Sequence, residues 1–151
     1  MALLVAALGP GAALAASWAV YPVDDSQSRT EPPSAPLRWR APLPTRGAPA
    51  LLDALVTVRI VLNLAPWLGK SARIYMVMPP LPQSSLSVEW TGSGTLQGGR
   101  LASGQRQLVY QGVVAGPRLE DTLKLRATVD ARDLQPLPPV NFRFEIEVPT
   151  P

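Results

Sequence analysis

Hydrophobic and polar residues alternate with a period of two along much of the chain. The clearest case is the segment 140–148, in which five apolar residues alternate with four polar ones. Successive side chains of a β-strand point to opposite faces of a sheet, so this pattern predicts strands with one buried and one wet face. The predicted strands are 56–63, 73–78, 86–90, 107–114, 122–129 and 140–148.

Turn-forming residues separate these segments, with Pro and Gly clustered between consecutive strands. Short strands separated by such turn-forming residues favour an antiparallel arrangement of two packed sheets. We therefore expect an all-β fold over residues 50–151, an antiparallel β-sandwich with the size of an immunoglobulin-like domain and about seven strands. The seventh strand is expected near Trp39 or at 95–101, and a bulge is expected at Gly112.

Two further expectations concern the interior and the start of the sandwich. The chain has no cysteine, so no disulfide is available, and Trp90 is expected to lie in the core with the apolar faces of the strands. The segment 49–55 is the one place with a helical pattern. It predicts either a helix of at most two turns or the lead-in to the first long strand.

The beginning of the chain has the layout of a secretory signal peptide. An unbroken apolar run over 1–8 is followed by the helix breakers of 9–11, and two small residues, Ala13 and Ala15, occupy the positions that signal peptidase reads for cleavage after Ala15. We expect a signal peptide over 1–15, with cleavage after Ala19 as the alternative. The run is shorter than the roughly 20 residues that span a bilayer, so the mature chain is expected to be periplasmic or extracellular, with no membrane span.

The next segment, 16–49, is rich in proline and is expected to be a linker. Such a composition buries little apolar surface and favours extended conformations. Within it, the residues 37–40 alternate apolar and basic side chains. They predict a short first strand with Trp39 turned inward, or else a free proline-rich ligand for a groove-type receptor.

Composition excludes several kinds of chemistry. The absence of histidine and cysteine removes His-based catalytic triads and metal sites built from those residues. The glycine-rich segment 92–98 lacks the spacing of phosphate-binding loops and is expected to connect a hairpin. We therefore expect no enzymatic activity, no cofactor and no metal. The net charge is +3, but the basic residues are dispersed, so no nucleic-acid binding is expected.

Two surface features are candidates for contacts with a partner. The first is a loop between two long strands that contains Trp67, Leu68 and Lys70. Its Trp either folds over the end of the core or is an exposed anchor, since Trp is enriched where interfaces concentrate binding energy. The second is the last strand, expected near a sheet edge, where Arg143 and Glu145 lie on the wet face and a partner strand could pair.

These observations predict an exported, non-enzymatic module that makes protein–protein contacts in a bacterial-type cell envelope, with a structural or accessory role. The expected partner is another envelope or secreted protein, whose identity the sequence does not specify. The sequence also leaves the oligomeric state open. The alternative is a carbohydrate-binding or adhesive module whose stacking platform uses surface aromatics chosen from Trp67, Tyr75, Trp90 and Tyr110.

Overall fold

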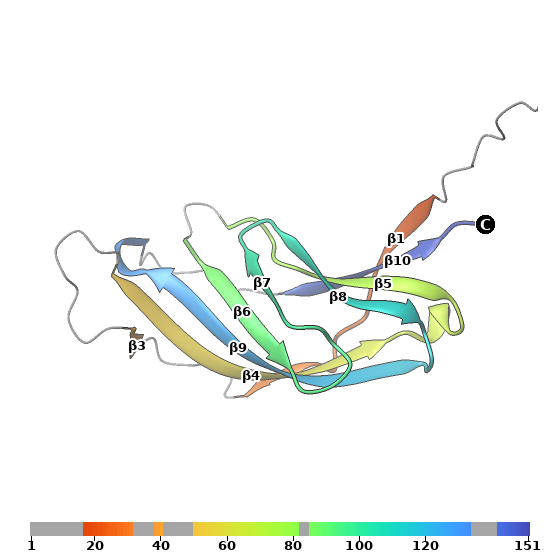
Figure 1. The fold of residues 1–151 in the computed structure, drawn as a ribbon, viewed down its shortest axis with the longest axis horizontal. Coiled ribbons are helices and arrows are strands. Elements are labelled where there is room, and N and C mark those ends of the chain that lie inside the picture. The colour runs from red at the N-terminus through yellow and green to blue at the C-terminus, as the bar shows by residue number, and fades with distance from the viewer. Residues whose placement is uncertain (1–16, 32–37, 41–49, 82–84, 134–141) are drawn as a thin grey trace, which may run out of the picture.

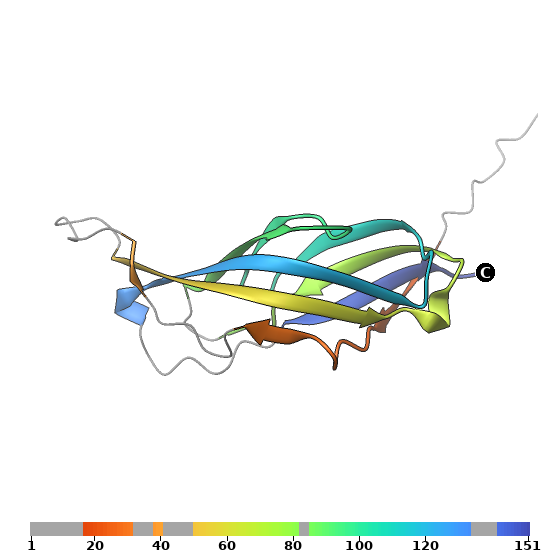
Figure 2. The ribbon, with the colours of Figure 1, turned by 90° about the horizontal axis from the view of Figure 1, so that it is seen from below.

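The computed structural model shows an all-β chain in which two antiparallel sheets pack face to face (Figure 1). Figure 2 shows that two long twisted strands run along most of the molecule. Neither of the two short 3-10 helices in the described part of the chain is long enough to cross a membrane. The structure describes residues 17–31, 38–40, 50–81, 85–133 and 142–151.

The smaller sheet has four strands and the larger sheet has six, counted over the described residues. The smaller sheet has the order β1 (Trp18–Pro22), β10 (Arg143–Pro149), β5 (Ser71–Val77) and β8 (Arg106–Val113). The larger sheet has the order β2 (Arg29–Glu31), β4 (Leu51–Asn63), β9 (Arg118–Asp130), β6 (Ser87–Gly92) and β7 (Gly99–Ala102), and β3 (Arg38–Trp39) also pairs with β4. The 3-10 helices are η1 (Ala65–Trp67) and η2 (Ala131–Asp133).

The core lies between the sheets and is built from the inward positions of the alternating strands. Trp90 is 3% exposed, and its indole N–H donates a 3.0 Å hydrogen bond to the carbonyl of Gln97. The expectation that Trp90 lies in the core is therefore confirmed. Its core neighbours from five strands include Ile60, Leu62, Ile74, Met76, Val88, Leu123, Leu125, Phe144 and Ile146.

The strand predictions are confirmed in position, because each of the six alternating segments overlaps an observed strand. Both candidates for the seventh strand are also present, as β3 and β7. Residues 51–55 begin β4, so the helical alternative for this segment is wrong. The register shift between β5 and β8 falls at Ile74 and Tyr75, whereas Gly112 pairs regularly with Ala72, so the bulge expected at Gly112 is also misplaced.

The segment expected to be a linker contributes strands to both sheets, which corrects that expectation for its described residues. β1 pairs with β10 over five positions and β2 pairs with β4 over three. β10 consequently lies between β1 and β5, so the expectation that the last strand lies near a sheet edge is wrong. The expected signal peptide, 1–15, lies outside the described residues.

Candidate binding groove

The outer face of the larger sheet carries a groove with a volume of about 910 Å³, and a second hollow of about 640 Å³ adjoins it. The two hollows share four lining residues, so we treat them as one surface and call it the basic groove. Its defining residues are Arg38, Trp39, Arg40, Asp53, Leu55, Glu89, Arg100, Lys124, Arg126 and Thr128.

Strand register builds the floor of the basic groove. Leu55 of β4 lies opposite Arg126 of β9, Arg126 lies opposite Glu89 of β6, and Glu89 lies opposite Arg100 of β7. Directly opposite residues of antiparallel strands project from the same face of the sheet. Four strands, from three separate parts of the sequence, therefore place one row of side chains across the outer face.

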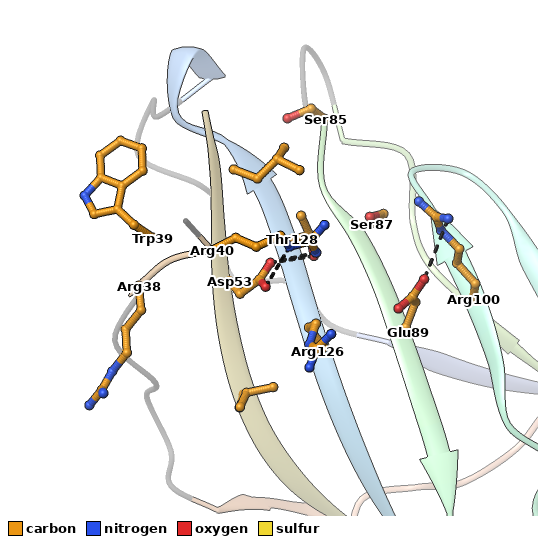
Figure 3. Close-up of a pocket in the computed structure, with 12 residues that line it drawn as sticks. Arg38, Trp39, Arg40, Asp53, Ser85, Ser87, Glu89, Arg100, Arg126 and Thr128 are labelled. Atoms are coloured by element: carbon orange, nitrogen blue, oxygen red, sulfur yellow. Dashed lines mark hydrogen bonds and ion pairs between the residues drawn. The ribbon is translucent and has the colours of Figure 1, made fainter. Parts of the chain in front are cut away.

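A hydrogen-bonded network fixes one side of the groove (Figure 3). The Nε and Nη2 atoms of Arg40 donate to the two oxygens of Asp53, each at 3.0 Å, and Nη2 also donates to Thr128 Oγ1 at 2.9 Å. The Thr128 hydroxyl in turn donates to Asp53 Oδ1 at 2.8 Å. The hydrogen bonds from Arg40 lower the pKa of the Asp53 carboxyl below its usual range, so both groups are charged at neutral pH.

The other side of the groove holds a looser pair. Arg100 Nη1 lies 3.7 Å from Glu89 Oε1, and both side chains are more than half exposed. An exposed ion pair of this kind contributes little free energy and separates readily. Arg38, Lys124 and Arg126 make no ion pair with any described residue. Five basic side chains line the two hollows, against three carboxylates, those of Glu31, Asp53 and Glu89, so the groove carries an excess of positive charge.

Two large apolar side chains accompany these charges. Leu55 is 65% exposed and Trp39 is 53% exposed, so the expectation that Trp39 points inward is wrong. Trp39 lies opposite Leu52, near the end of β4 that extends past the smaller sheet, and no described strand of that sheet faces it there (Figure 1). In Figure 3, Trp39 and Arg38 lie beyond β4 while Arg40 reaches back across it.

The loop residues predicted to contact a partner lie elsewhere, at the connection between β4 and β5. Trp67 is half-buried and packs against the core, and its ring lies 6.0 Å from that of Tyr21, centroid to centroid. Leu68 is 53% exposed, and Lys70 is also exposed. The Trp67 ring thus covers the end of the core, while Leu68 and Lys70 face solvent.

The other two predicted contact residues lie on the outer face of the smaller sheet. Arg143 Nε lies 3.5 Å from Glu145 Oε1, and Glu145 is also 3.8 Å from Arg106. Arg143 pairs with Val77, at the far end of β5 from Lys70. At about 3.3 Å per residue, that separation is about 20 Å. The structure therefore divides the five predicted residues between two separate places.

The aromatics considered for a sugar platform do not share an exposed face. Trp90 is buried, and the Arg106 guanidinium lies 4.1 Å above the Tyr75 ring. The Tyr110 hydroxyl donates a 2.7 Å hydrogen bond to the carbonyl of Val113. A stacking surface for sugars needs its aromatic rings open to solvent, and none of these three rings supplies one.

Sequence analysis did not identify the basic groove, because its residues come from five strands whose neighbours are set by the tertiary fold. The one local signal was the adjacency of Trp39 and Arg40. Among the described residues, no three potential metal ligands cluster together. No family model matches the chain, and neither a curated protein nor a solved structure shows detectable similarity to it.

Proposed function

We propose that this chain is an exported, non-enzymatic module of a bacterial-type cell envelope that binds another protein through the basic groove. One observation carries the proposal: exposed Leu55 lies beside Arg100 and Arg126 on a hollowed sheet face, and exposed Trp39 lies at the margin of the hollow, beyond β4. Trp and Arg are the residues most enriched where protein interfaces concentrate their binding energy.

The charges of the groove also favour binding over catalysis. A general acid works at neutral pH only when its pKa is raised. The hydrogen bonds from Arg40 have the opposite effect on Asp53 and lower its pKa. The Asp53 carboxylate also accepts a hydrogen bond from the Thr128 hydroxyl. We therefore assign it the role of orienting Arg40.

Export is supported by the position of β1, the first strand among the described residues. β1 starts at Trp18, so cleavage after Ala15 would leave this strand whole. Cleavage after Ala19 would remove two of its five residues. We therefore favour Ala15, and a chain without cysteine is suited to an oxidising compartment.

We also infer that the seven strands β4 to β10 form an immunoglobulin-like sandwich. They divide into four strands and three strands, as in constant-type domains of that class. The strand order departs from theirs at three strands, because β4, the first of the seven, pairs with β9, the last strand β10 pairs with β5, and β7 pairs with β6. β1 and β2 are then additions at the sheet edges.

The predicted contact residues remain secondary candidates. Leu68 and Lys70 face solvent beside Trp67, and Arg143 and Glu145 present charge on the smaller sheet. The basic groove is preferred over both places because it combines a hollow, exposed apolar side chains and cations that form no ion pair with a described residue.

Site-specific photocrosslinking in cells tests the proposal. A photoreactive amino acid placed at Leu55 is expected to form an adduct with a discrete protein in the exported fraction. The matched control position is Val113, which is 55% exposed but lies on the smaller sheet. No adduct from position 55, or the same adducts from both positions, would contradict binding through the groove. Recovery of the chain in the cytosol alone would contradict export.

A further inference from the structure

We infer that the segment bound in the basic groove is an extended acidic peptide with carboxylates at alternate positions, two of which contact Lys124 and Arg126. This inference rests on the proposed function and specifies the chemistry of the partner. The charge, the spacing and the apolar surroundings of these two cations support it.

The charges of the basic groove favour an acidic ligand. Asp53 already neutralises Arg40, with two hydrogen bonds between them, and Glu89 lies next to Arg100. Lys124 and Arg126 form no ion pair with any described residue, although Glu89 of β6 lies directly opposite Arg126. A guanidinium group forms paired hydrogen bonds with a carboxylate, so an acidic ligand would complete the groove.

The spacing of Lys124 and Arg126 along β9 matches the repeat of an extended peptide. Lys124 and Arg126 are two residues apart on β9 and project from its outer face, where Thr128 follows. Alternate side chains of a strand lie roughly 6.6 Å apart. An extended peptide has the same repeat, so carboxylates at its alternate positions would meet Lys124 and Arg126 in register.

An exposed apolar side chain lies beside these cations. Leu55 lies directly opposite Arg126, and its side chain is 65% exposed. An apolar residue of the peptide can cover Leu55 while its acidic neighbours bind the cations. Interfaces of this kind combine an apolar contact, which contributes affinity, with charges that set orientation and speed of association.

A titration followed by nuclear magnetic resonance tests the inference on ¹⁵N-labelled protein recovered from expression of the full chain. The probe is the blocked pentapeptide Glu-Leu-Glu-Leu-Glu, and its counterpart has Gln at all three Glu positions. The acidic probe is expected to shift the amide signals of Leu55, Lys124 and Arg126, and its binding should weaken as salt is added. The Gln peptide should bind at least fivefold more weakly.

Two charge-removing variants provide the matched comparison. Arg126→Gln should weaken binding of the acidic probe at least fivefold. Arg59→Gln removes the same charge from the same sheet face but outside the groove, and it should change binding less than twofold. Unchanged signals from the core of each variant establish that it is folded.

Several results would overturn the inference. These are equal binding of the acidic and Gln peptides, shifts confined to other surfaces, equal effects of the two variants, or no binding of the acidic probe. Binding of an oligogalacturonate in the groove without binding of the peptide would assign the site to an acidic polysaccharide instead. If the peptide fails while the crosslink from position 55 remains, the acidic-peptide inference fails and the proposed function stands. The absence of a crosslink from position 55 would refute the proposed function.

Discussion

Ala19 of β1 lies opposite Val148 of β10, and this pairing gives β10 a neighbour on both sides. The contact continues beyond the strand, because the amide of Thr150 donates a 2.9 Å hydrogen bond to the carbonyl of Ser17. The Arg73 guanidinium lies 4.2 Å above the ring of Trp18. An uncovered β10 would be an exposed edge, which is a site for pairing with other chains.

Shortening the N-terminus is therefore expected to affect stability at a sharp boundary. A chain that starts at Ala16 should keep β1, whereas one that starts at Val20 loses the contacts of Ser17 and Trp18. A cation–π contact contributes about 0.5–1 kcal/mol and a hydrogen bond about 1 kcal/mol, so the shorter chain should lose about 2 kcal/mol. Thermal melts and size-exclusion chromatography measure this. Equal melting temperatures and no added self-association would contradict a stabilising role for β1.

Phe144 and its neighbour Arg143 provide a direct test of strand alternation. Phe144 is 2% exposed in the core, whereas the Arg143 side chain is 62% exposed. Phe144→Ala should lower the free energy of unfolding by about 3–5 kcal/mol, because it leaves a cavity. Arg143→Ala should lower it by less than about 1 kcal/mol. Urea denaturation measures the free energy of unfolding of both variants. Equal losses would refute the assignment of Phe144 to the buried face and Arg143 to the exposed face of β10.

Asp121 is a buried carboxylate that holds the loop after β6. Its oxygens accept hydrogen bonds from the Leu96 amide at 2.7 Å, the Ser93 hydroxyl at 3.1 Å and the Thr122 amide at 2.6 Å. Asp121→Ala leaves buried donors without a partner and should cost about 1–3 kcal/mol. The control is Glu120→Ala, whose side chain is 43% exposed. A loss no larger than the control's, measured by urea denaturation, would show that the loop does not depend on Asp121.

Sequence alternation was sufficient to predict β4, β5, β6, β8, β9 and β10, because each has a buried and an exposed face, whereas β7 was one of two candidates for the seventh strand. β1 was missed because Trp18 to Pro22 is apolar throughout and ends in proline. β2 was missed because all three of its residues are exposed, so it has no apolar face to detect. The basic groove was missed for a different reason. Leu55 and Arg126 are 71 positions apart, and only the pairing of β4 with β9 brings them together.

The pH dependence of stability should reveal the Arg40–Asp53 pair. The pKa of Asp53 is lower in the folded chain than its ordinary value of 3.8, mainly because of hydrogen bonds from Arg40. The ionised carboxylate therefore stabilises the fold above about pH 4, and this contribution is lost as the pH falls through the folded-state pKa. Asp130, whose pKa is lowered to about 2 by Arg132, acts in the same direction.

Melting temperatures of Asp53→Asn measured from pH 6 to pH 2 test this linkage. The difference from the unchanged chain should be largest near pH 6 and should shrink as the pH falls below about 4. Leu55→Ala, which changes an exposed side chain without an ionisable group, should give a difference that does not vary with pH. A constant difference for Asp53→Asn would contradict the role given to Arg40.

The affinity of the partner crosslinked from position 55, measured by calorimetry against the purified chain, tests the central claim most directly. Leu55→Asp places a carboxylate beside Arg126 and removes an apolar contact, and Leu55 is exposed enough for the fold to tolerate the change. The variant is expected to bind the partner at least tenfold more weakly. Val113→Asp makes the same change on the smaller sheet and should weaken binding less than twofold. Unchanged affinity for Leu55→Asp, or an equal loss for Val113→Asp, would contradict binding through the basic groove.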